Sequence, residues 1–356
     1  MEFKNSKVAI IGAGPAGCMC AYFAKENCEV TLFDFASPLH TLLYTGGGRC
    51  NLAYAEYYFK DLAKFYPRGE KFLYSVFSAF STADTTEFFE KIGVETYIQD
   101  DLRIFPTTNS AKDVREKFLD AIRPCKIKRE KVLKVIKRSD EFLLTTDCDS
   151  YHFDIVVIAV GGHAGFSLAK NFDHEIIEPK PALVGLVTKK ILKPIQGVSL
   201  KNVSAEVFFE NSPNNVMLNS IQHRKGERLC DPELNSGRRV TQLQDDILFT
   251  HEGISGPLAY KISSICARLR YNGQNPLKIK LDFIQQELDL QGLLNSNPKK
   301  DIKNLVSEFV PKSLANYLLT SNGIDLEAKC CNINAKMRDL ILKSLTEFEI
   351  EVISPT

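Results

Sequence analysis

Short apolar runs and one helical stretch alternate at the start of the chain. Residues 7–11 (Lys-Val-Ala-Ile-Ile) have the length and composition of a buried parallel strand. Glycines interrupt this run at 12–17, residues 18–26 predict a helix, and residues 29–33 predict a second strand. This order predicts a βαβ unit, in which a right-handed crossover joins two parallel strands.

Helical and extended patterns continue as far as residue 162. A helical pattern covers residues 70–92 with a break near Ser81-Thr82, and Ser110 is placed to cap a helix that ends near Ile122. Residues 154–160 form another apolar run, which two glycines end. We therefore expect a third buried strand and an α/β fold class for this half of the chain.

The pattern changes after Pro179-Lys180-Pro181. Short β-like segments alternate with turns up to about Phe249, and from Gly256 the pattern is mainly helical until a final predicted strand at 349–353. The regular alternation of strand and helix is lost here. We therefore expect a domain boundary at the two prolines and a separate β-rich and helical module after it.

Length and charge narrow the classes of function. A chain of 356 residues favours two domains over one compact core. The net charge of +1 gives no bulk attraction to nucleic acid or to anionic membranes. The chain has no run of about 18 apolar residues, and its polar N-terminus lacks the apolar segment of a signal peptide. We therefore expect a cytoplasmic protein that does not act at a membrane.

The ten cysteines are scattered along the chain. The nearest pairs, Cys18 with Cys20 and Cys330 with Cys331, lack the spacing of a zinc site or of a redox motif. We therefore expect no metal, and interpret the cysteines as reduced, mostly buried thiols of a cytosolic protein.

A glycine motif lies between the first predicted strand and the first predicted helix. Gly12 permits a tight turn, Gly14 lets the backbone approach a pyrophosphate, and Gly17 lets the helix pack close to the strand. Asp34 lies 22 positions after Gly12 (34 − 12), at the end of the second strand, where its carboxylate can bind a ribose hydroxyl and disfavour a 2′-phosphate. The motif, which includes Pro15 and Ala16, therefore predicts a site for FAD or NAD at the helix N-terminus.

A second glycine-rich segment runs from Thr45 to Asn51. Three consecutive glycines, Gly46 to Gly48, favour a backbone that lies against a flat or anionic group. Arg49 adds a charge and Asn51 adds hydrogen-bonding groups of both kinds. Cys50 has no partner in a redox motif, so we interpret it as a structural thiol.

These strings resemble the BaiN/YhiN-like family of bacterial FAD-dependent oxidoreductases, which includes proteins described as NAD(P)/FAD-dependent or as the aminoacetone oxidase family. The strings that carry the resemblance are the glycine motif, Gly-Gly-Gly-Arg-Cys-Asn at 46–51, Arg-Ile-Phe-Pro at 103–106, Ala-Val-Gly-Gly at 159–162, and Leu-Phe-Thr-His-Glu-Gly-Ile-Ser-Gly-Pro at 248–257. The resemblance covers essentially the whole chain.

The resemblance implies a two-dinucleotide-binding-domain type of flavoprotein, with a Rossmann-type FAD domain interrupted by a β-barrel-like and helical insertion. It implies an FAD domain at 1–178, an inserted substrate domain at 179–333, and a partial return to the FAD domain at 334–356. Family members normally continue with a glycine-rich segment, a strand carrying Gly-Glu near the flavin and a closing helix, which this chain lacks.

The resemblance also implies roles for individual residues. The glycines of the first motif would hold the pyrophosphate of FAD, Asp34 the adenosine ribose, and Val132 would offer its backbone to the adenine. The flavin side would be lined by Gly47, Gly48, Arg49, Cys50 and Asn51, with a second glycine contact at Gly161 and Gly162.

His251 is the candidate acid or base. A histidine titrates near neutrality and could pass a proton while a hydride moves to or from the flavin. Glu252 is adjacent, and Ser255 with Pro257 predicts a helix start whose N–H groups could stabilise negative charge. The alternative is a turn in which His251 only satisfies backbone groups.

A basic stretch raises the question of nucleic acid. It contains eight basic residues between Arg123 and Arg138, but Glu130, Asp140 and Glu141 lie among them or directly after them. The surrounding residues, 126–146, predict an antiparallel pair of strands that turns at Ser139-Asp140. We interpret the stretch as a solvated face and expect nucleic acid not to be a partner.

The sequence therefore predicts an FAD-dependent oxidoreductase that transfers a hydride between flavin and a small organic substrate or a reduced nicotinamide. Because no second glycine motif is visible, NAD(P)H would visit only transiently as electron donor. Two alternatives stay open. One is an FAD-dependent RNA-modifying enzyme, and the other is a non-catalytic or degenerate flavin-binding protein.

Overall fold

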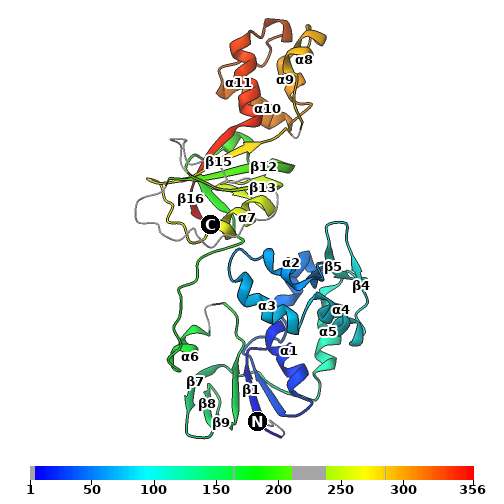
Figure 1. Cartoon of the computed structure of the whole chain (residues 1–356), viewed down its shortest axis with the longest axis vertical. Helices are drawn as coiled ribbons and strands as arrows, with labels where there is room; N and C mark the ends of the chain where they lie inside the picture. Colours follow the sequence, from blue (N-terminus) through cyan, green and yellow to red (C-terminus); the bar gives the residue numbers. More distant parts are fainter. Residues whose placement is uncertain (1–4, 163–164, 211–237, 285) are drawn as a thin grey trace. The chain divides into compact units, whose positions relative to one another are not determined.

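The computed structural model describes residues 5–162, 165–210, 238–284 and 286–356 (Figure 1). They form two compact units, Met1–Pro179 and Lys180–Thr356. Two clusters of buried residues lie in the first unit and a third lies in the second unit.

A parallel sheet forms the centre of the first unit. Its strand order is β10-β1-β2-β6, with β10 at Ile155–Ile158, β1 at Lys7–Ile11, β2 at Glu29–Phe33 and β6 at Lys126–Lys128. Helix α1 (Pro15–Ala24) connects β1 to β2 (Figure 1). The predicted βαβ unit is therefore confirmed, and the carboxyl ends of β1 and β2 lead into the glycine motif and Asp34.

Two helices of the first unit begin at serine caps. Ser81 separates α3 (Glu70–Ala79) from α4 (Thr82–Lys91), and the Asp84 carboxylate accepts from the Ser81 N–H at 2.7 Å in a capping box. Ser110 accepts from the Asp113 N–H and caps α5 (Ala111–Ala121). The predicted break near Ser81-Thr82 and the predicted cap Ser110 are thus confirmed. The short helices α2 (Phe59–Lys64) and α6 (Phe166–Lys170) complete this set.

Two small antiparallel sheets flank the parallel one. Their orders are β3-β5-β4 (Ala53–Tyr54, Arg103–Pro106, Thr96–Ile98) and β7-β8-β9 (Val132–Lys137, Phe142–Thr146, Ser150–Phe153). The predicted antiparallel pair at 126–146 is only partly present. Residues 126–128 instead join the parallel sheet beside β2, because a three-residue connection separates them from β7 and leaves them in register with Thr31 to Phe33.

A closed six-stranded barrel forms the second unit. Its order is β11-β14-β13-β12-β15-β16, at Leu186–Thr188, Gly253–Ser255, Arg238–Phe249, Ser199–Phe209, Leu277–Asp282 and Phe348–Pro355. Side chains alternate along β12 and β15 between buried and less buried positions, so one face of each strand fills the barrel. Helix α7 (Gly256–Cys266) begins at the N-cap residue Ser255, as predicted, and packs against β13.

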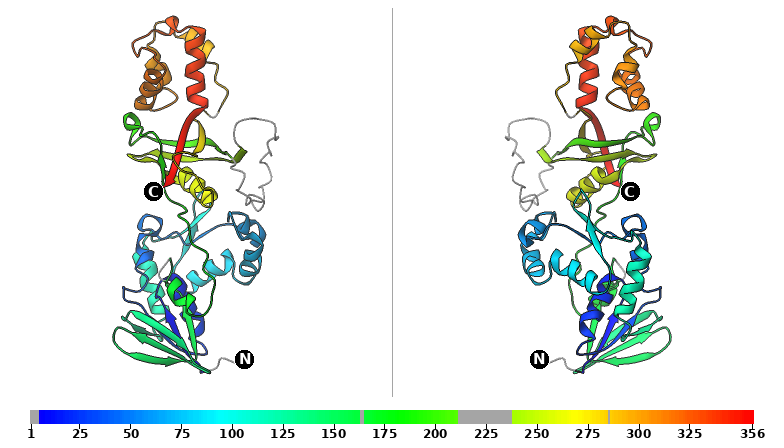
Figure 2. Two further views of the ribbon diagram at one scale, coloured as in Figure 1. Left: turned by 90° about the vertical axis from the view of Figure 1, so that its left-hand side faces the viewer. Right: turned by 90° about the vertical axis from the view of Figure 1, so that its right-hand side faces the viewer.

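Four helices lie beyond one end of the barrel strands (Figures 1 and 2). They are α8 (Leu290–Ser296), α9 (Ile302–Val306), α10 (Lys312–Ser321) and α11 (Ala335–Thr346). Their buried leucines and isoleucines belong to the same core cluster as the barrel interior, so helices and barrel form one unit.

The end of the chain differs from the expectation. Residues 334–356 do not return to the first unit, because β16 pairs with β15 along Phe348 to Val352 and with β11 at its other end, and so closes the barrel. The pattern of 256–348 also contains β15, whose alternating Leu277, Ile279 and Leu281 are buried in the barrel. Isolated amphipathic strands between helices are easily read as helix from a single sequence.

Among the described residues, five of the nine cysteines are buried, namely Cys18, Cys50, Cys125, Cys266 and Cys330. Within the same residues, no helix combines the length and the apolar character needed to cross a membrane.

Candidate dinucleotide-binding site

The turn after β1 requires glycine at two positions. Gly12 has φ +103°, and a Cβ there would lie 2.5 Å from the carbonyl oxygen of Ala159 on the neighbouring strand connection. A Cβ at Gly17 would lie 1.9 Å from the carbonyl oxygen of Gly12. Both contacts are far too short, so the close approach of α1 to the sheet depends on these glycines.

Gly14 plays a different part. It is the N-cap residue of α1 with φ −75°, which any residue can adopt, and a Cβ there would meet nothing within 4 Å. Pro15 takes the first helical turn, and this turn carries no acidic residue. The N–H groups of Ala16 and Gly17 therefore lie at a helix end with room and positive potential for a phosphate.

Asp34 connects the end of β2 to the glycine turn. Its carboxylate accepts from the Ala13 N–H at 2.8 Å through one oxygen and from the Ala36 N–H at 2.9 Å through the other. A carboxylate offers about four acceptor positions, and these bonds use two. Asp34 is part-buried and still has acceptor capacity for ribose hydroxyls beside a helix N-terminus. The residues present therefore fit the adenosine diphosphate part of FAD.

Arg115 supports this corner, and no signal in the sequence identified it. From α5 its guanidinium donates to the carbonyl oxygen of Pro38 at 2.9 Å and to the hydroxyl of Ser37 at 2.7 Å. The next residue, Leu39, donates its N–H to the carbonyl oxygen of Ala13 at 2.8 Å. The segment after Asp34 is thereby fixed against the glycine turn.

The second glycine segment is a left-handed stretch of backbone. Gly46, Gly47 and Gly48 have φ of +56°, +67° and +84°. A Cβ at Gly46 would lie 2.7 Å from the Asn51 nitrogen, whereas a Cβ at Gly47 would meet nothing within 4 Å. Gly47 and Gly48 are exposed. The segment can therefore present bare backbone to a flat group such as a flavin ring.

Arg49 and Asn51 are held by the strand β5 and its surroundings. The Arg49 guanidinium lies over the Phe105 ring, 4.2 Å from its centroid, and its Nε donates to the carbonyl oxygen of Gly46 at 3.3 Å. With its amide nitrogen turned toward the backbone, Asn51 donates to the carbonyl oxygen of Ala53 at 3.0 Å. These contacts fix a half-buried cation beside the exposed glycines.

Cys50 has the properties of a structural thiol. Its side chain is 3% exposed, its φ is +65°, and its N–H donates to the carbonyl oxygen of Thr45 at 3.0 Å. Burial raises the pKa of this thiol above its ordinary value, which keeps it neutral at pH 7. A neutral buried thiol is a poor nucleophile.

The remaining predicted cofactor residues lie in the same unit. Gly161 and Gly162 follow β10 with φ of +64° and +48°, and both are exposed. Val132 begins β7 and pairs with Thr146. Near it, Glu130 accepts hydrogen bonds from Thr146 and Tyr151. Burial opposes ionisation of Glu130, but these hydrogen bonds and Lys128 outweigh it and lower the pKa of the carboxyl.

His251 belongs to the second unit, on the turn between β13 and β14. The Thr250 N–H donates to the carbonyl oxygen of Gly253 at 2.8 Å and closes this turn. The His251 side chain is 72% exposed, and its Nε2 lies 3.7 Å from a carboxylate oxygen of Glu252. The exposed ring of His251 is accessible to a ligand, whereas the predicted cofactor residues all belong to the first unit.

The Rossmann-domain model of the HI0933-like proteins matches residues 6–330 of this chain. The chain belongs to the HI0933-like family. This match confirms the resemblance to the BaiN/YhiN-like flavoproteins and the predicted fold class, with its Rossmann-type domain and barrel-like module. The fold of an HI0933-like protein is of the FAD-binding oxidoreductase type.

Two curated relatives align with nearly the whole chain. The ribosomal RNA dihydrouridine synthase of Escherichia coli (strain K12) is 24% identical over 357 residues, which cover 96% of this chain and 80% of that protein. The protein of the same name from Haemophilus influenzae is 25% identical over 370 residues, with 97% and 80% covered.

Similarity to solved structures is confined to part of the chain. The bacillithiol disulfide reductase of Staphylococcus aureus is 18% identical with a TM-score of 0.26, over 44% of this chain and 39% of that one. The chain therefore spans less than half the length of that structure.

Proposed function

We propose that this HI0933-like protein is an FAD-dependent oxidoreductase that reduces uridine to dihydrouridine in RNA. The glycine turn supports FAD as the cofactor, because Gly14 and the N-terminus of α1 leave room for a pyrophosphate beside Asp34. The similarity to two ribosomal RNA dihydrouridine synthases over 96% and 97% of the chain supports RNA as the substrate.

In this proposal each loop of the first unit has a separate task. The N–H groups of Ala16 and Gly17 bind the pyrophosphate, and Asp34 accepts from the ribose hydroxyls. The exposed backbone of Gly47 and Gly48 faces the flavin, with Arg49 beside it. Val132 contacts the adenine, and Gly161 and Gly162, which follow the neighbouring strand β10, also border the cofactor.

Reduction of uridine adds a hydride to one carbon of the C5–C6 double bond and a proton to the other. Bound FAD supplies the two-electron chemistry, and NAD(P)H is the proposed electron donor. The protein has to deliver the proton, and His251 is the proposed donor because its ring is exposed and a protonated imidazole can act as a general acid.

The assignment of RNA replaces the expectation that nucleic acid is not a partner. The basic stretch of the sequence does not motivate this change. Four of its eight cations form ion pairs with carboxylates: Arg123 with Asp120, Lys126 with Glu29, Lys128 with Glu130, and Arg138 with Glu141. Such a surface has little net charge to offer a phosphate backbone.

A visible absorbance spectrum of the purified protein, with release and identification of its flavin, tests the cofactor. The flavin-loaded protein is then incubated with ribosomal RNA that lacks dihydrouridine and with NADPH or NADH. Nucleosides are analysed by mass spectrometry for a gain of two hydrogens on uridine. We expect bound FAD and dihydrouridine that depends on the nicotinamide.

His251→Asn is the variant that tests the proton donor. We expect it to keep its flavin spectrum and to form dihydrouridine about 100-fold more slowly, which is the usual scale of a lost general acid. A protein that takes up no FAD would overturn the whole proposal. A flavoprotein that oxidises NAD(P)H but leaves RNA unchanged would return the substrate to a small organic molecule.

A further inference from the structure

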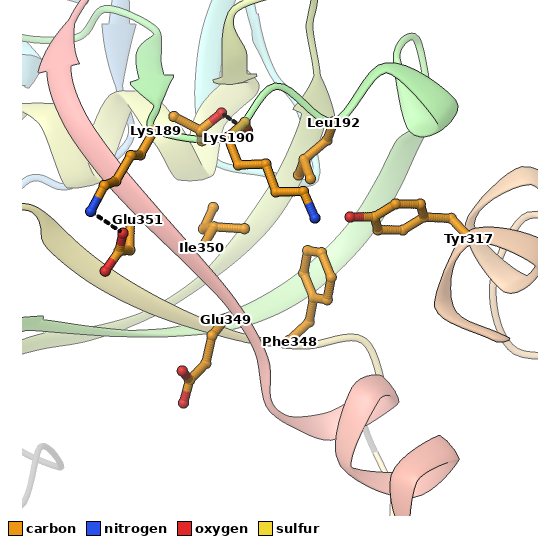
Figure 3. Close-up of a pocket in the computed structure, with 9 residues that line it drawn as sticks. Lys189, Lys190, Leu192, Tyr317, Phe348, Glu349, Ile350 and Glu351 are labelled. Carbon is orange, nitrogen blue, oxygen red and sulfur yellow. Dashed lines mark hydrogen bonds and ion pairs between the residues drawn. The ribbon is translucent and has the colours of Figure 1, made fainter. Parts of the chain in front are cut away.

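A pocket of about 510 Å³ lies in the second unit, between the segment after β11, the start of β16 and helix α10 (Figure 3). Its lining includes Lys189 and Lys190 from the first segment, Phe348 from β16, and Tyr317 from α10. The volume is within the range of small-ligand sites. All these residues belong to one compact unit, so the pocket is defined by that unit alone.

The charges around the pocket leave one cation without a counter-charge. Lys189 pairs with Glu351 at 3.0 Å, and Glu349 lies 3.5 Å from Lys280 on β15. Among the residues that the structure describes, the amine of Lys190 has no ion-pair or hydrogen-bond partner. An anionic group would therefore complement the pocket.

The hydroxyl of Tyr317 points into the same space. Figure 3 shows the Lys190 side chain reaching toward this hydroxyl, above the ring of Phe348. Within the described part of the chain, the hydroxyl has no hydrogen-bond partner either. A half-buried phenol can both donate and accept, which suits the edge of a nucleobase.

The ring of Phe348 is held rigidly at the pocket wall. It meets Tyr317 edge-on, with centroids 6.3 Å apart and an interplanar angle of 79°, and it lies 5.6 Å from the ring of Phe283. Phe348 is only partly buried. A fixed aromatic ring with a cation and a hydroxyl nearby is the combination that receives unpaired bases of RNA.

The segment that follows the pocket residues carries a further positive charge. Lys193 is exposed and lies three residues after Lys190, and Ile191 between them is 52% exposed. Within the part of the chain that the structure describes, Lys189 is the only one of the three lysines in 189–193 that forms an ion pair. Lys190 and Lys193 thus provide two cations close together in the chain for the phosphates of a strand, which favours a polynucleotide over a single nucleotide.

We propose that this pocket binds one unpaired nucleotide of the RNA substrate. Its base contacts Phe348, Tyr317 hydrogen-bonds to the base edge, and Lys190 contacts a phosphate. Lys193 contacts the next phosphate along the strand. This inference rests on the proposed function and assigns RNA binding to the barrel and helices rather than to the basic stretch of the first unit.

Fluorescence anisotropy of a labelled oligouridine of about 12 nucleotides tests the pocket, with the full chain titrated at several salt concentrations. Lys190→Ala should weaken binding roughly fivefold and reduce the slope of log K against log salt by about 0.7, the value for one phosphate of a single strand. Tyr317→Phe should weaken binding roughly fivefold without changing the slope, because it removes one hydrogen bond.

Lys336→Ala is the matched control, since Lys336 is exposed on α11, lies outside the pocket and carries the same charge. Equal effects of Lys190→Ala and Lys336→Ala would overturn the pocket while leaving RNA as substrate. Absence of oligouridine binding by the unaltered chain that nevertheless forms dihydrouridine would also overturn it. Absence of both would remove the RNA substrate itself. Competition by uridine monophosphate as strong as by oligouridine would reassign the pocket to a free nucleotide.

Discussion

The three glycines of the turn after β1 are needed for two different reasons, and only the reason for Gly14 concerns a ligand. Gly12 and Gly17 are required by the protein itself, because a Cβ at either position would collide with backbone. A Cβ at Gly14 would meet nothing in the protein. The proposed reason for glycine at position 14 is therefore the close approach of a pyrophosphate.

Gly14→Ala separates cofactor binding from stability. We expect the variant to unfold with a free energy within about 1 kcal/mol of the unaltered protein, because its backbone is in an ordinary region. We expect its FAD affinity to fall by at least about tenfold, since the methyl group would displace the pyrophosphate. Chemical denaturation and titration of the apoprotein with FAD measure the two quantities.

Gly273→Ala is the matched control, because a Cβ there also meets nothing within 4 Å and its position lies in the second unit. It should change neither quantity. Equal FAD affinity in Gly14→Ala and in the unaltered protein would refute the pyrophosphate role.

We expect the buried thiol of Cys18 to lower the stability of the protein at alkaline pH. Burial, with a smaller contribution from Asp34, raises the pKa of Cys18 from 9.0 to about 12. The folded state therefore holds the proton more tightly than the unfolded state, so this contribution is complete below pH 9 and is lost as pH rises toward 12. Cys18→Ala should reduce by about 1 kcal/mol the loss of unfolding free energy between about pH 8 and pH 10.

Urea denaturation of both proteins at the two pH values measures this difference. Cys331→Ala, at an exposed position, should leave the pH dependence unchanged. If Cys18→Ala and Cys331→Ala lose stability in parallel, titration of Cys18 does not contribute.

Single residues were predictable where a conformation or a motif requires them. Gly12, Gly17 and Asp34 follow from spacing, because the βαβ turn permits few alternatives. Arg115 could not be predicted, since its acceptors Ser37 and Pro38 lie 78 and 77 positions away and form no pattern in the sequence. The pocket residues Lys190 and Tyr317 could not be predicted for the same reason, because they are far apart in the sequence and form no pattern in it.

At the scale of elements, helix α5 begins at a local capping signal and positions part of the proposed cofactor site. Ser110 caps the helix through the Asp113 N–H at 3.3 Å, and Arg115 in its second turn holds the segment after Asp34. The apolar face of α5, with Val114 and Phe118, is buried in the same cluster as the glycine turn. The helix thus positions a loop that it does not itself form.

Ser110→Ala should lower the free energy of unfolding by about 1 kcal/mol, since the cap supplies one hydrogen bond to a helix end. Thermal or chemical denaturation measures it. Ser78→Ala removes a similar hydroxyl on the exposed side of α3 and should cost less than about 0.5 kcal/mol. Equal costs for the two substitutions would show that Ser110 contributes nothing as a cap.

Helices and strands that begin or end at a local sequence signal were predicted, whereas the strand whose partners depend on closing the barrel was not. The break between α3 and α4 at Ser81 follows from its capping residues. The partners of β16 depend on barrel closure, which brings Phe348 beside Leu281 and Val352 beside Leu277. No local pattern encodes which edge a terminal strand will join, so residues 334–356 were assigned to the wrong unit.

For the whole molecule, the cores of the two units have no member in common. Buried residues of the first unit end at Leu168, and those of the second begin at Leu186. The connection at 174–182 contains no helix or strand. Each unit therefore has the hydrophobic core of an independent domain.

Residues 1–179 produced alone should fold and retain FAD, because every proposed cofactor contact lies within them. The matching fragment 180–356 should fold without flavin and bind the labelled oligouridine with most of the affinity of the full chain. Neither fragment alone should form dihydrouridine, since the proposed proton donor His251 and the flavin loops lie in different units. Circular dichroism, flavin absorbance and the anisotropy titration measure these outcomes. If the first fragment folds but releases FAD, then cofactor contacts from the second unit are essential, and the assignment of the cofactor to the first unit alone fails.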